Sequence, residues 1–133
     1  MLPLSLLLID LDDFKQLNDQ HGHTAGDDVL IETARRFDEQ CRTSELLGRY
    51  GGEEFMVLLP ETGEEEATQF AQRLVDRARE NAIDTVGGDL VVTSSVGVAE
   101  AREDETAASL IVRADAPMYQ AKSLGKARVH VSE

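Results

Sequence analysis

Short apolar runs alternate along the chain with longer stretches in which apolar residues recur at helical spacing. Residues 4–9 form an apolar run without a helical gap, which predicts a buried strand, and the β-branched stretch 90–99 predicts another. Val29, Leu30, Ala34 and Phe37 are spaced as on one face of a helix. The same criteria predict helices at 12–19, 25–41, from 62 onward and at 107–123, and strands at 4–9, 46–50, 54–59, 83–86, 90–99 and 127–131.

The order of these elements predicts an α+β fold in which helices pack on a mostly antiparallel sheet. Gly51-Gly52 joins strands 46–50 and 54–59 with the signature of a hairpin, and Gly87-Gly88 does the same for 83–86 and 90–99. Pro117 lies inside the last helix. It either kinks that helix or begins a new first turn, because proline has no N–H and crowds the preceding turn.

The composition narrows the class of protein. With 133 residues, 41% of them hydrophobic, we expect a single domain over 1–133 with an ordinary core. The net charge of −13 argues against binding to nucleic acid or to anionic lipid. The single cysteine excludes an internal disulfide. Because no apolar run approaches the length of a membrane span or of a signal peptide, we expect a cytoplasmic location and no membrane contact.

The order of the predicted strands and helices indicates which acidic side chains would lie close together. The strand that ends at Asp10 and the strand that enters Gly51 are joined by helices, so in one sheet they would run parallel and end at a common edge. Oxygen ligands without paired His or Cys favour Mg²⁺ or Mn²⁺, and a glycine-rich turn beside them suits a triphosphate. A solvated acidic rim is the alternative. Five carboxylates would lie along this edge: Asp10, Asp12, Asp13, Glu53 and Glu54.

Several sequence blocks carry a family resemblance. They are D-L-D-D-F-K-Q-L-N-D at 10–19, G-H-T-A-G-D at 22–27, R-Y-G-G-E-E-F at 49–55, S-V-G-V-A at 95–99 and R-A-D-A-P-M-Y-Q-A-K-S-L-G-K at 113–126. In this order they resemble GGDEF domains, the bacterial diguanylate cyclases that condense two GTP molecules into the second messenger cyclic di-GMP. The resemblance covers nearly the whole chain and implies a fold similar to nucleotide cyclases and polymerase palms.

The resemblance also implies roles for the acidic residues. Asp10 and Glu53 would hold Mg²⁺ or Mn²⁺ with their carboxylates, the Leu11 carbonyl would add a backbone ligand, and Glu54 would complete or support the site. Glu53 would also take the proton of the 3′-hydroxyl of GTP. That oxygen would then attack the α-phosphate of a second GTP and release pyrophosphate.

Further residues match the family's substrate contacts. Lys15 and the Phe14 and Lys15 amides would bind phosphate at a helix start. Asn18 and Asp27 would read guanine. Gly51 and Gly52 would let the backbone pass against the nucleotide. Lys122 and Lys126 would bind the terminal phosphates, and Arg49 would brace the turn.

Three departures from the family pattern stand out. Relatives under product inhibition carry R-x-x-D before the signature, whereas this chain has Arg42 and Glu45 there, and the longer Glu side chain would misplace the pairing with guanine. Lys126 stands where many relatives have Arg. The lysine keeps the positive charge but lacks the planar fork of a guanidinium. The chain also starts at Met1-Leu-Pro-Leu, without the extra helix that usually precedes the first strand, so we expect an N-terminally truncated domain.

The resemblance leads to a Mg²⁺-dependent diguanylate cyclase that acts as a homodimer, because two GTP molecules must meet and one acidic rim holds one of them. A sensory or receiver module is expected upstream in the full-length protein. One alternative is a catalytically weak module that binds GTP or cyclic di-GMP. Another is an inert fragment that lacks its first helix.

Overall fold

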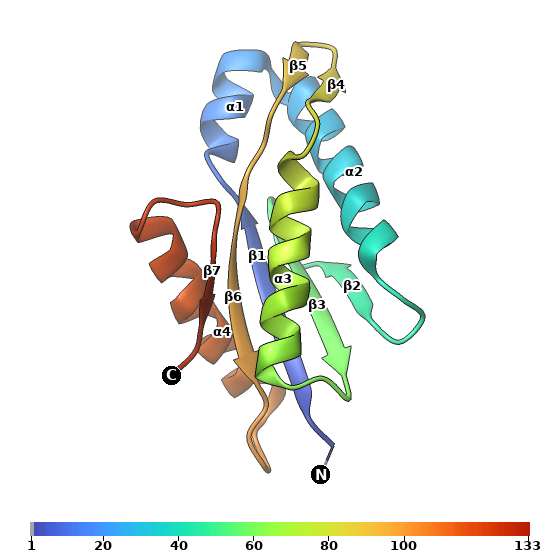
Figure 1. The fold of residues 1–133 in the computed structure, drawn as a ribbon. Helices are drawn as coiled ribbons and strands as arrows, with labels where there is room; N and C mark the ends of the chain where they lie inside the picture. Colours follow the sequence, from blue (N-terminus) through green and yellow to red (C-terminus); the bar gives the residue numbers. More distant parts are fainter. Residues whose placement is uncertain (1) are drawn as a thin grey trace.

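The computed structural model describes residues 2–133, and its main sheet has five strands with helices on both faces (Figure 1). β1 lies at the centre and pairs antiparallel with both of its neighbours, so the predicted α+β fold with a mostly antiparallel sheet is confirmed. Only β7 runs parallel to its partner, β6. In sheet order the strands are β2 (Leu46–Arg49), β3 (Glu54–Pro60), β1 (Leu4–Leu11), β6 (Ser94–Glu100) and β7 (Val129–Val131).

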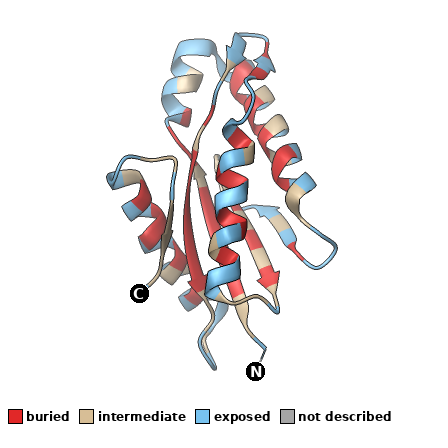
Figure 2. Ribbon diagram, viewed as in Figure 1, coloured by how far each residue is buried: buried red, intermediate tan, exposed pale blue. Residues whose placement is uncertain are grey.

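Both faces of β1 are buried, which explains why its sequence is a continuous apolar run. Leu7 and Ile9 lie in the core under two long helices, whereas Leu6 and Leu8 lie in a second core under the last helix. Figure 2 shows the resulting band of buried residues along β1 and β6. The helices are α1 (Phe14–His21), α2 (His23–Gln40), α3 (Glu64–Arg79) and α4 (Ala107–Ser123).

The predicted strand over 90–99 is wrong in its first part. The chain forms β5 (Gly88–Leu90), leaves strand geometry, and enters β6 only at Ser94. β5 pairs with β4 (Ile83–Thr85) in a separate two-stranded sheet, so the expected hairpin exists, with its turn at Val86 and Gly87. Residues 91–93 lie between two different partners: β4 pairs only as far as Leu90, whereas the Thr93 carbonyl already accepts a hydrogen bond from the Asp12 N–H at 2.9 Å, next to the pairing of β1 with β6.

The last helix runs unbroken through Pro117, so this proline does not begin a new helix. Instead, the backbone of α4 lies almost against β6 at Gly97. A Cβ atom on Gly97 would stand 2.0 Å from the Ala114 carbonyl oxygen and 2.5 Å from the Met118 nitrogen. The absence of a side chain at Gly97 therefore sets how closely α4 approaches the sheet, and α4 in turn delivers its C-terminal residues to the end of β1.

Candidate functional site

The end of β1 and the turn between β2 and β3 lie at the same edge of the sheet. β3 stands between β1 and β2 and is antiparallel to both, so β1 and β2 run parallel, as the topology predicted. Asp10 is the direct cross-strand partner of Glu54. The Leu11 N–H donates to the Glu53 carbonyl at 3.1 Å. These contacts bring three residues of the expected site to the same edge of the sheet: Asp10 on β1, Glu54 on β3 and Glu53 in the turn before β3.

The Gly-Gly turn is held in shape by Arg49. Its Nε donates to the Gly51 carbonyl at 3.1 Å and its Nη2 to the Gly52 carbonyl at 2.6 Å. The Gly51 N–H also donates to the Glu54 carbonyl at 3.2 Å. A Cβ on Gly51 would stand 3.0 Å from Glu54 Oε1, so a larger residue would push on that carboxylate. The turn is thus fixed by hydrogen bonds within it.

Asp10 carries an unusual carboxylate. Burial, with the charges of Glu53 and Glu54, raises the pKa of Asp10 to about 6, although the Lys122 ammonium opposes the shift. Its Oδ1 is buried and, within residues 2–133, has no hydrogen-bond partner. This oxygen accepts no hydrogen bond there, but it forms an ion pair with Lys122 Nζ at 3.4 Å, so a positive charge is already favoured at this place and a hard cation suits it. This atom therefore fits the divalent ion that the family resemblance implies.

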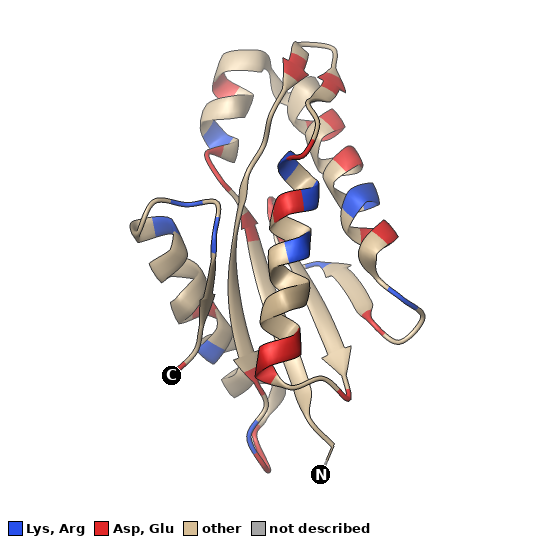
Figure 3. Cartoon of the chain, viewed as in Figure 1, with Lys and Arg blue, Asp and Glu red and all other residues tan. Residues whose placement is uncertain are grey.

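Lys122, at the end of α4, approaches the same oxygens. Its Nζ lies 2.9 Å from Asp12 Oδ1, 3.4 Å from Asp10 Oδ1 and 3.4 Å from the Leu11 carbonyl oxygen. Lys126, in the loop after α4, pairs instead with Asp13. Figure 3 shows basic residues at the end of α4 and in the loop that follows it. Both lysines that the resemblance assigns to phosphates thus contact acidic groups here.

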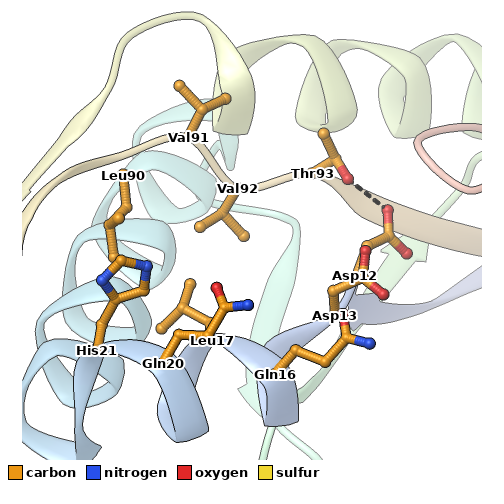
Figure 4. A pocket seen from close by; sticks show the side chains of 10 residues that line it. All are labelled: Asp12, Asp13, Gln16, Leu17, Gln20, His21, Leu90, Val91, Val92 and Thr93. Atoms are coloured by element: carbon orange, nitrogen blue, oxygen red, sulfur yellow. Dashed lines mark hydrogen bonds between the residues drawn. The ribbon is translucent and has the colours of Figure 1, made fainter.

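The Asp12 carboxylate accepts more hydrogen bonds than any other side chain of the site, within residues 2–133. From the sequence, Asp12 is expected only as one of five carboxylates at this edge. Its carboxylate accepts hydrogen bonds from Thr93 Oγ1 and Ser95 Oγ at 2.7 Å each, from Ala127 N at 3.0 Å and from Lys122. Burial alone would raise the pKa of Asp12, but these hydrogen bonds outweigh burial and lower it. Figure 4 shows Asp12 at one end of a cavity of about 220 Å³ between α1 and residues 90–93.

Two of the five carboxylates expected at this edge, those of Asp12 and Asp13, are paired with lysines. In the part of the chain that the structure describes, residues 2–133, no three acidic, His or Cys side chains lie close enough together to hold a metal ion. Asp12 and Asp13 each have a lysine of their own, because α4 and its following loop bring Lys122 and Lys126 against them. The remaining candidate metal ligands are Asp10 Oδ1 and the Leu11 carbonyl, which both lie near the Lys122 ammonium, with Glu54 of β3 and Glu53 of the turn alongside.

The junction of α1 and α2 holds the predicted base-reading pair. Asn18 Oδ1 is buried and finds no hydrogen-bond partner among the described residues. It lies against Gly26, where a Cβ would stand 1.8 Å from Asn18 Oδ1 and 3.3 Å from the buried Phe14 ring. Asp27 follows on α2 and is exposed, as is Lys15 on the first turn of α1. An unpaired acceptor here is a costly feature that a ligand can relieve.

An apolar cavity of about 300 Å³ opens between α2 and the β2–β3 hairpin. The exposed side chain of Ile31 and the buried ring of Phe55 both line it, and Arg49 stands at the same wall. Because Arg49 is also bonded to the Gly-Gly turn, this cavity and the turn share a side chain. The lining residues are Leu30, Ile31, Ala34, Leu47, Gly48, Arg49 and Phe55.

The Arg42–Glu45 segment is held by hydrogen bonds among its own residues. The Glu45 side chain is only 3% exposed, and its carboxylate accepts from Arg42 N at 3.3 Å, from Arg42 Nε at 3.1 Å and from the Ser44 hydroxyl. Arg42 also borders a polar cavity of about 240 Å³ with Arg73, whose guanidinium lies 5.4 Å from the Phe70 ring centre. Sequence reasoning missed Arg73, because α3 brings it there from a distant part of the chain.

No helix among residues 2–133 combines the length and the apolar character that crossing a bilayer demands.

A mostly antiparallel sheet whose central strand ends in acidic residues beside a Gly-Gly turn is the architecture of a nucleotide-cyclase palm domain. The family model "Diguanylate cyclase, GGDEF domain" matches residues 2–128, and the chain belongs to this family. The resemblance stated from the sequence motifs is thereby confirmed, as is the enzyme class of the family.

Individual relatives agree with this assignment. Diguanylate cyclase A of Treponema denticola is 41% identical over 131 residues, which are 98% of this chain and 35% of that protein. The crystal structure of the diguanylate cyclase SiaD from Pseudomonas aeruginosa, in complex with its activator SiaC, matches with a TM-score of 0.94 at 40% identity, over 98% of this chain and 50% of that one.

The active GGEEF domain of a diguanylate cyclase from Vibrio cholerae matches with a TM-score of 0.89 at 33% identity, over 98% of this chain and 83% of that one. The chain therefore spans most of an isolated domain of this family but only about a third of the curated relative.

Proposed function

We propose that this domain is a diguanylate cyclase that condenses two GTP molecules into one cyclic di-GMP and two pyrophosphates. The observation that carries the proposal is the Gly-Gly turn held by Arg49 beside Asp10, whose buried Oδ1 has no hydrogen-bond partner within residues 2–133. The Vibrio cholerae domain described as active also has the GGEEF form, which supports catalysis with Glu53 in the third position of the motif.

The donor set fits Mg²⁺ or Mn²⁺. Asp10 Oδ1 and the Leu11 carbonyl supply hard oxygen atoms. The carboxylates of Glu53, in the turn, and of Glu54, on β3, would move toward them to complete the site, because among residues 2–133 no three such side chains stand close enough together. When bound, the ion would offset the negative charge of the phosphates and lower the pKa of the attacking hydroxyl. The raised pKa of Asp10, to about 6, supports this assignment, since a cation relieves the same repulsion and burial that a proton relieves.

The chain's own residues would bind and orient the nucleotide. The unpaired Asn18 Oδ1 and the exposed Asp27 carboxylate would accept hydrogen bonds from the guanine edge. Leaving such an acceptor unpaired costs about 1–3 kcal/mol, which would discriminate against adenine. The amides of Phe14 and Lys15, at the positive end of α1, would face phosphate oxygens, and the Lys15 ammonium would add a positive charge.

Glu53 would receive the proton of the 3′-hydroxyl, and the resulting oxygen would attack the α-phosphate of a second GTP. Gly51 and Gly52 would let the backbone approach the nucleotide. Lys122 and Lys126 would carry the terminal phosphates that leave as pyrophosphate. Because one acidic edge presents one GTP, two copies of the domain would have to face each other as a homodimer. Since GTP is an intracellular nucleotide, the reaction would take place in the cytoplasm.

Regulation would come from two sources. A longer protein would carry a sensory or receiver module upstream of this catalytic domain, and the SiaD structure with its activator supports control by a partner. Arg42 would offer charge to cyclic di-GMP as part of an inhibitory site. The Glu45 carboxylate, however, is buried against Arg42 and Ser44, so it would have to turn outward before it could pair with a guanine base.

The test is product formation. The domain, dimerised through a fused coiled coil, is incubated with GTP and MgCl₂, and cyclic di-GMP is measured by chromatography. We expect product from the wild type and none from Glu53→Gln, which keeps the shape of the side chain but cannot take the proton. An unchanged melting temperature of the variant would separate chemistry from folding. Absence of product from the dimerised wild type, with GTP binding seen by calorimetry, would contradict the proposal and favour a binding module.

A further inference from the structure

We propose that Lys122 is a built-in counter-ion: in the nucleotide-free domain its ammonium stands at the oxygens of Asp10 and Leu11 that a divalent cation would use, and Asp12 positions it there. This inference rests on the proposed function, because it concerns the same metal site. It assigns to Lys122 a second position, distinct from the phosphate contact that the family resemblance implies.

The contacts of the ammonium carry the inference. Lys122 Nζ lies 2.9 Å from Asp12 Oδ1 and 3.4 Å from both Asp10 Oδ1 and the Leu11 carbonyl oxygen. The ammonium donates hydrogen bonds to Asp12 Oδ1 and to the Leu11 carbonyl oxygen, and it forms an ion pair with Asp10 Oδ1. The Lys122 side chain is 24% exposed and that of Asp10 is 15% exposed, so solvent screens this pair only in part. A positive charge thus already stands where the acidic edge needs one.

Asp12 is built to hold the lysine rather than a metal ion. Its side chain is 1% exposed, and its other hydrogen bonds come from Thr93, Ser95 and the Ala127 amide. Together with Lys122 these donors give each carboxylate oxygen two hydrogen bonds and fix its orientation, and within residues 2–133 Lys122 is its one ion-pair partner. Replacing the carboxylate would release the lysine, but would also disturb the other donors.

The loop after α4 depends on the same carboxylate. Gly125, Lys126 and Ala127 have φ values of 127°, 65° and 52°, three consecutive residues in the left-handed region. Non-glycine residues adopt such angles at a cost and keep them only when the surroundings hold them. The hydrogen bond from the Ala127 amide to Asp12 is one such restraint. Asp12 therefore positions both the end of α4 and the loop that carries the second lysine.

A divalent ion and this ammonium cannot share Asp10 Oδ1 and the Leu11 carbonyl, because two positive charges at such short range repel strongly in a partly buried site. Metal binding therefore requires Lys122 to leave. A triphosphate supplies the place to which it can move, since phosphate oxygens accept from an ammonium group. We therefore expect the domain to bind a divalent ion weakly without nucleotide and more tightly when a triphosphate is bound.

The experiment measures Mn²⁺ affinity of the nucleotide-free domain by electron paramagnetic resonance of the free ion. Lys122→Met and Lys122→Gln remove the charge, Lys122→Arg keeps it, and Lys126→Met is the matched control, because Lys126 contacts Asp13 instead of Asp10. We expect the two neutral variants at position 122 to bind Mn²⁺ about tenfold more tightly than the wild type. The arginine variant and the control should stay within about twofold of the wild type.

Two results would overturn the inference. One is a neutral variant at position 122 that folds and binds Mn²⁺ no more tightly than the wild type. The other is an equal gain for Lys126→Met, which would mean that any lost positive charge has the same effect. A measurement on the wild type is independent of variant folding: the NMR signal of the Lys122 ammonium should shift on Mg²⁺ titration while that of Lys126 does not. A Lys122 signal that does not respond to saturating Mg²⁺ would also refute it.

The proposed function is tested apart from this by cyclic di-GMP synthesis. If the wild type makes product and the neutral variants bind Mn²⁺ as the wild type does, the role of Lys122 as counter-ion fails alone. If the neutral variants bind Mn²⁺ more tightly and the dimerised wild type makes no product, the cyclase activity fails and the counter-ion stands.

Discussion

The contact between Gly26 and Asn18 allows nucleotide binding to be separated from folding. A Cβ at residue 26 would lie 1.8 Å from Asn18 Oδ1 and 2.9 Å from its Cγ, so Gly26→Ala forces the amide to rotate away. The obstacle is the end of a polar side chain, which can move. The expected consequence is therefore a displaced Asn18 with the helices left in place.

Two opposing effects set the stability of Gly26→Ala. Alanine inside a helix is favoured over glycine by about 1 kcal/mol, whereas an overpacked contact costs about 1–3 kcal/mol. The net loss in free energy of unfolding should then be about 0–2 kcal/mol. Loss of one hydrogen bond to guanine, with a buried acceptor left unpaired, costs about 1–3 kcal/mol, which raises KM for GTP roughly 5- to 150-fold.

The assay is cyclic di-GMP formation over a range of GTP concentrations, alongside thermal unfolding. Asn18→Ala serves as the matched control, because it removes the amide without adding a methyl group. In the double variant the added Cβ of residue 26 has no amide to displace, so the double variant should melt at or above the temperature of Asn18→Ala alone. A wild-type KM in Gly26→Ala would refute the reasoning, since Asn18 then contributes nothing to GTP binding from this position.

Three further predictions follow from the same edge of the sheet and its packing. The pKa of Asp10 is raised to about 6 in the native state, so the folded protein binds the proton of this carboxyl group more tightly than the unfolded chain does. Protonation of Asp10 therefore stabilises the fold at low pH, and this stabilisation is lost as the pH rises from about 4 to 6. Asp10→Asn should therefore raise the melting temperature at pH 8 but not at pH 4, and an equal change at both pH values would contradict this. Gly97→Ala, whose Cβ would stand 2.0 Å from the Ala114 carbonyl, should lower the free energy of unfolding by about 1–3 kcal/mol or more in denaturant titrations, and wild-type stability would refute it. Arg49→Lys cannot make both bonds to the Gly-Gly turn, so kcat should fall about tenfold with little change in melting temperature, whereas an unchanged kcat would show that the turn needs no brace.

Much of the secondary structure could be predicted from the sequence, because it depends on near neighbours in the chain. The apolar run of β1, the Gly-Gly turn and the helical spacing of α4 each act within a few residues, and α4 spans 107–123 as predicted. The order of the elements was enough to place β1 and β2 in parallel with their ends at one edge. The motifs identified the family from the order and spacing of their residues, without any contact between them being known.

The pairing of side chains at the site was decided by the tertiary structure. The expected long strand is divided because its first residues pair with β4 and its last residues pair with β1, in two separate sheets. Lys122 contacts Asp10 because Gly97 lets α4 lie close to the sheet, and Arg73 lines the same cavity as Arg42 because α3 brings it there. Periodicity records which face of an element is apolar. It carries no information on which charged groups of distant segments will meet, since that depends on how closely the packed elements approach one another.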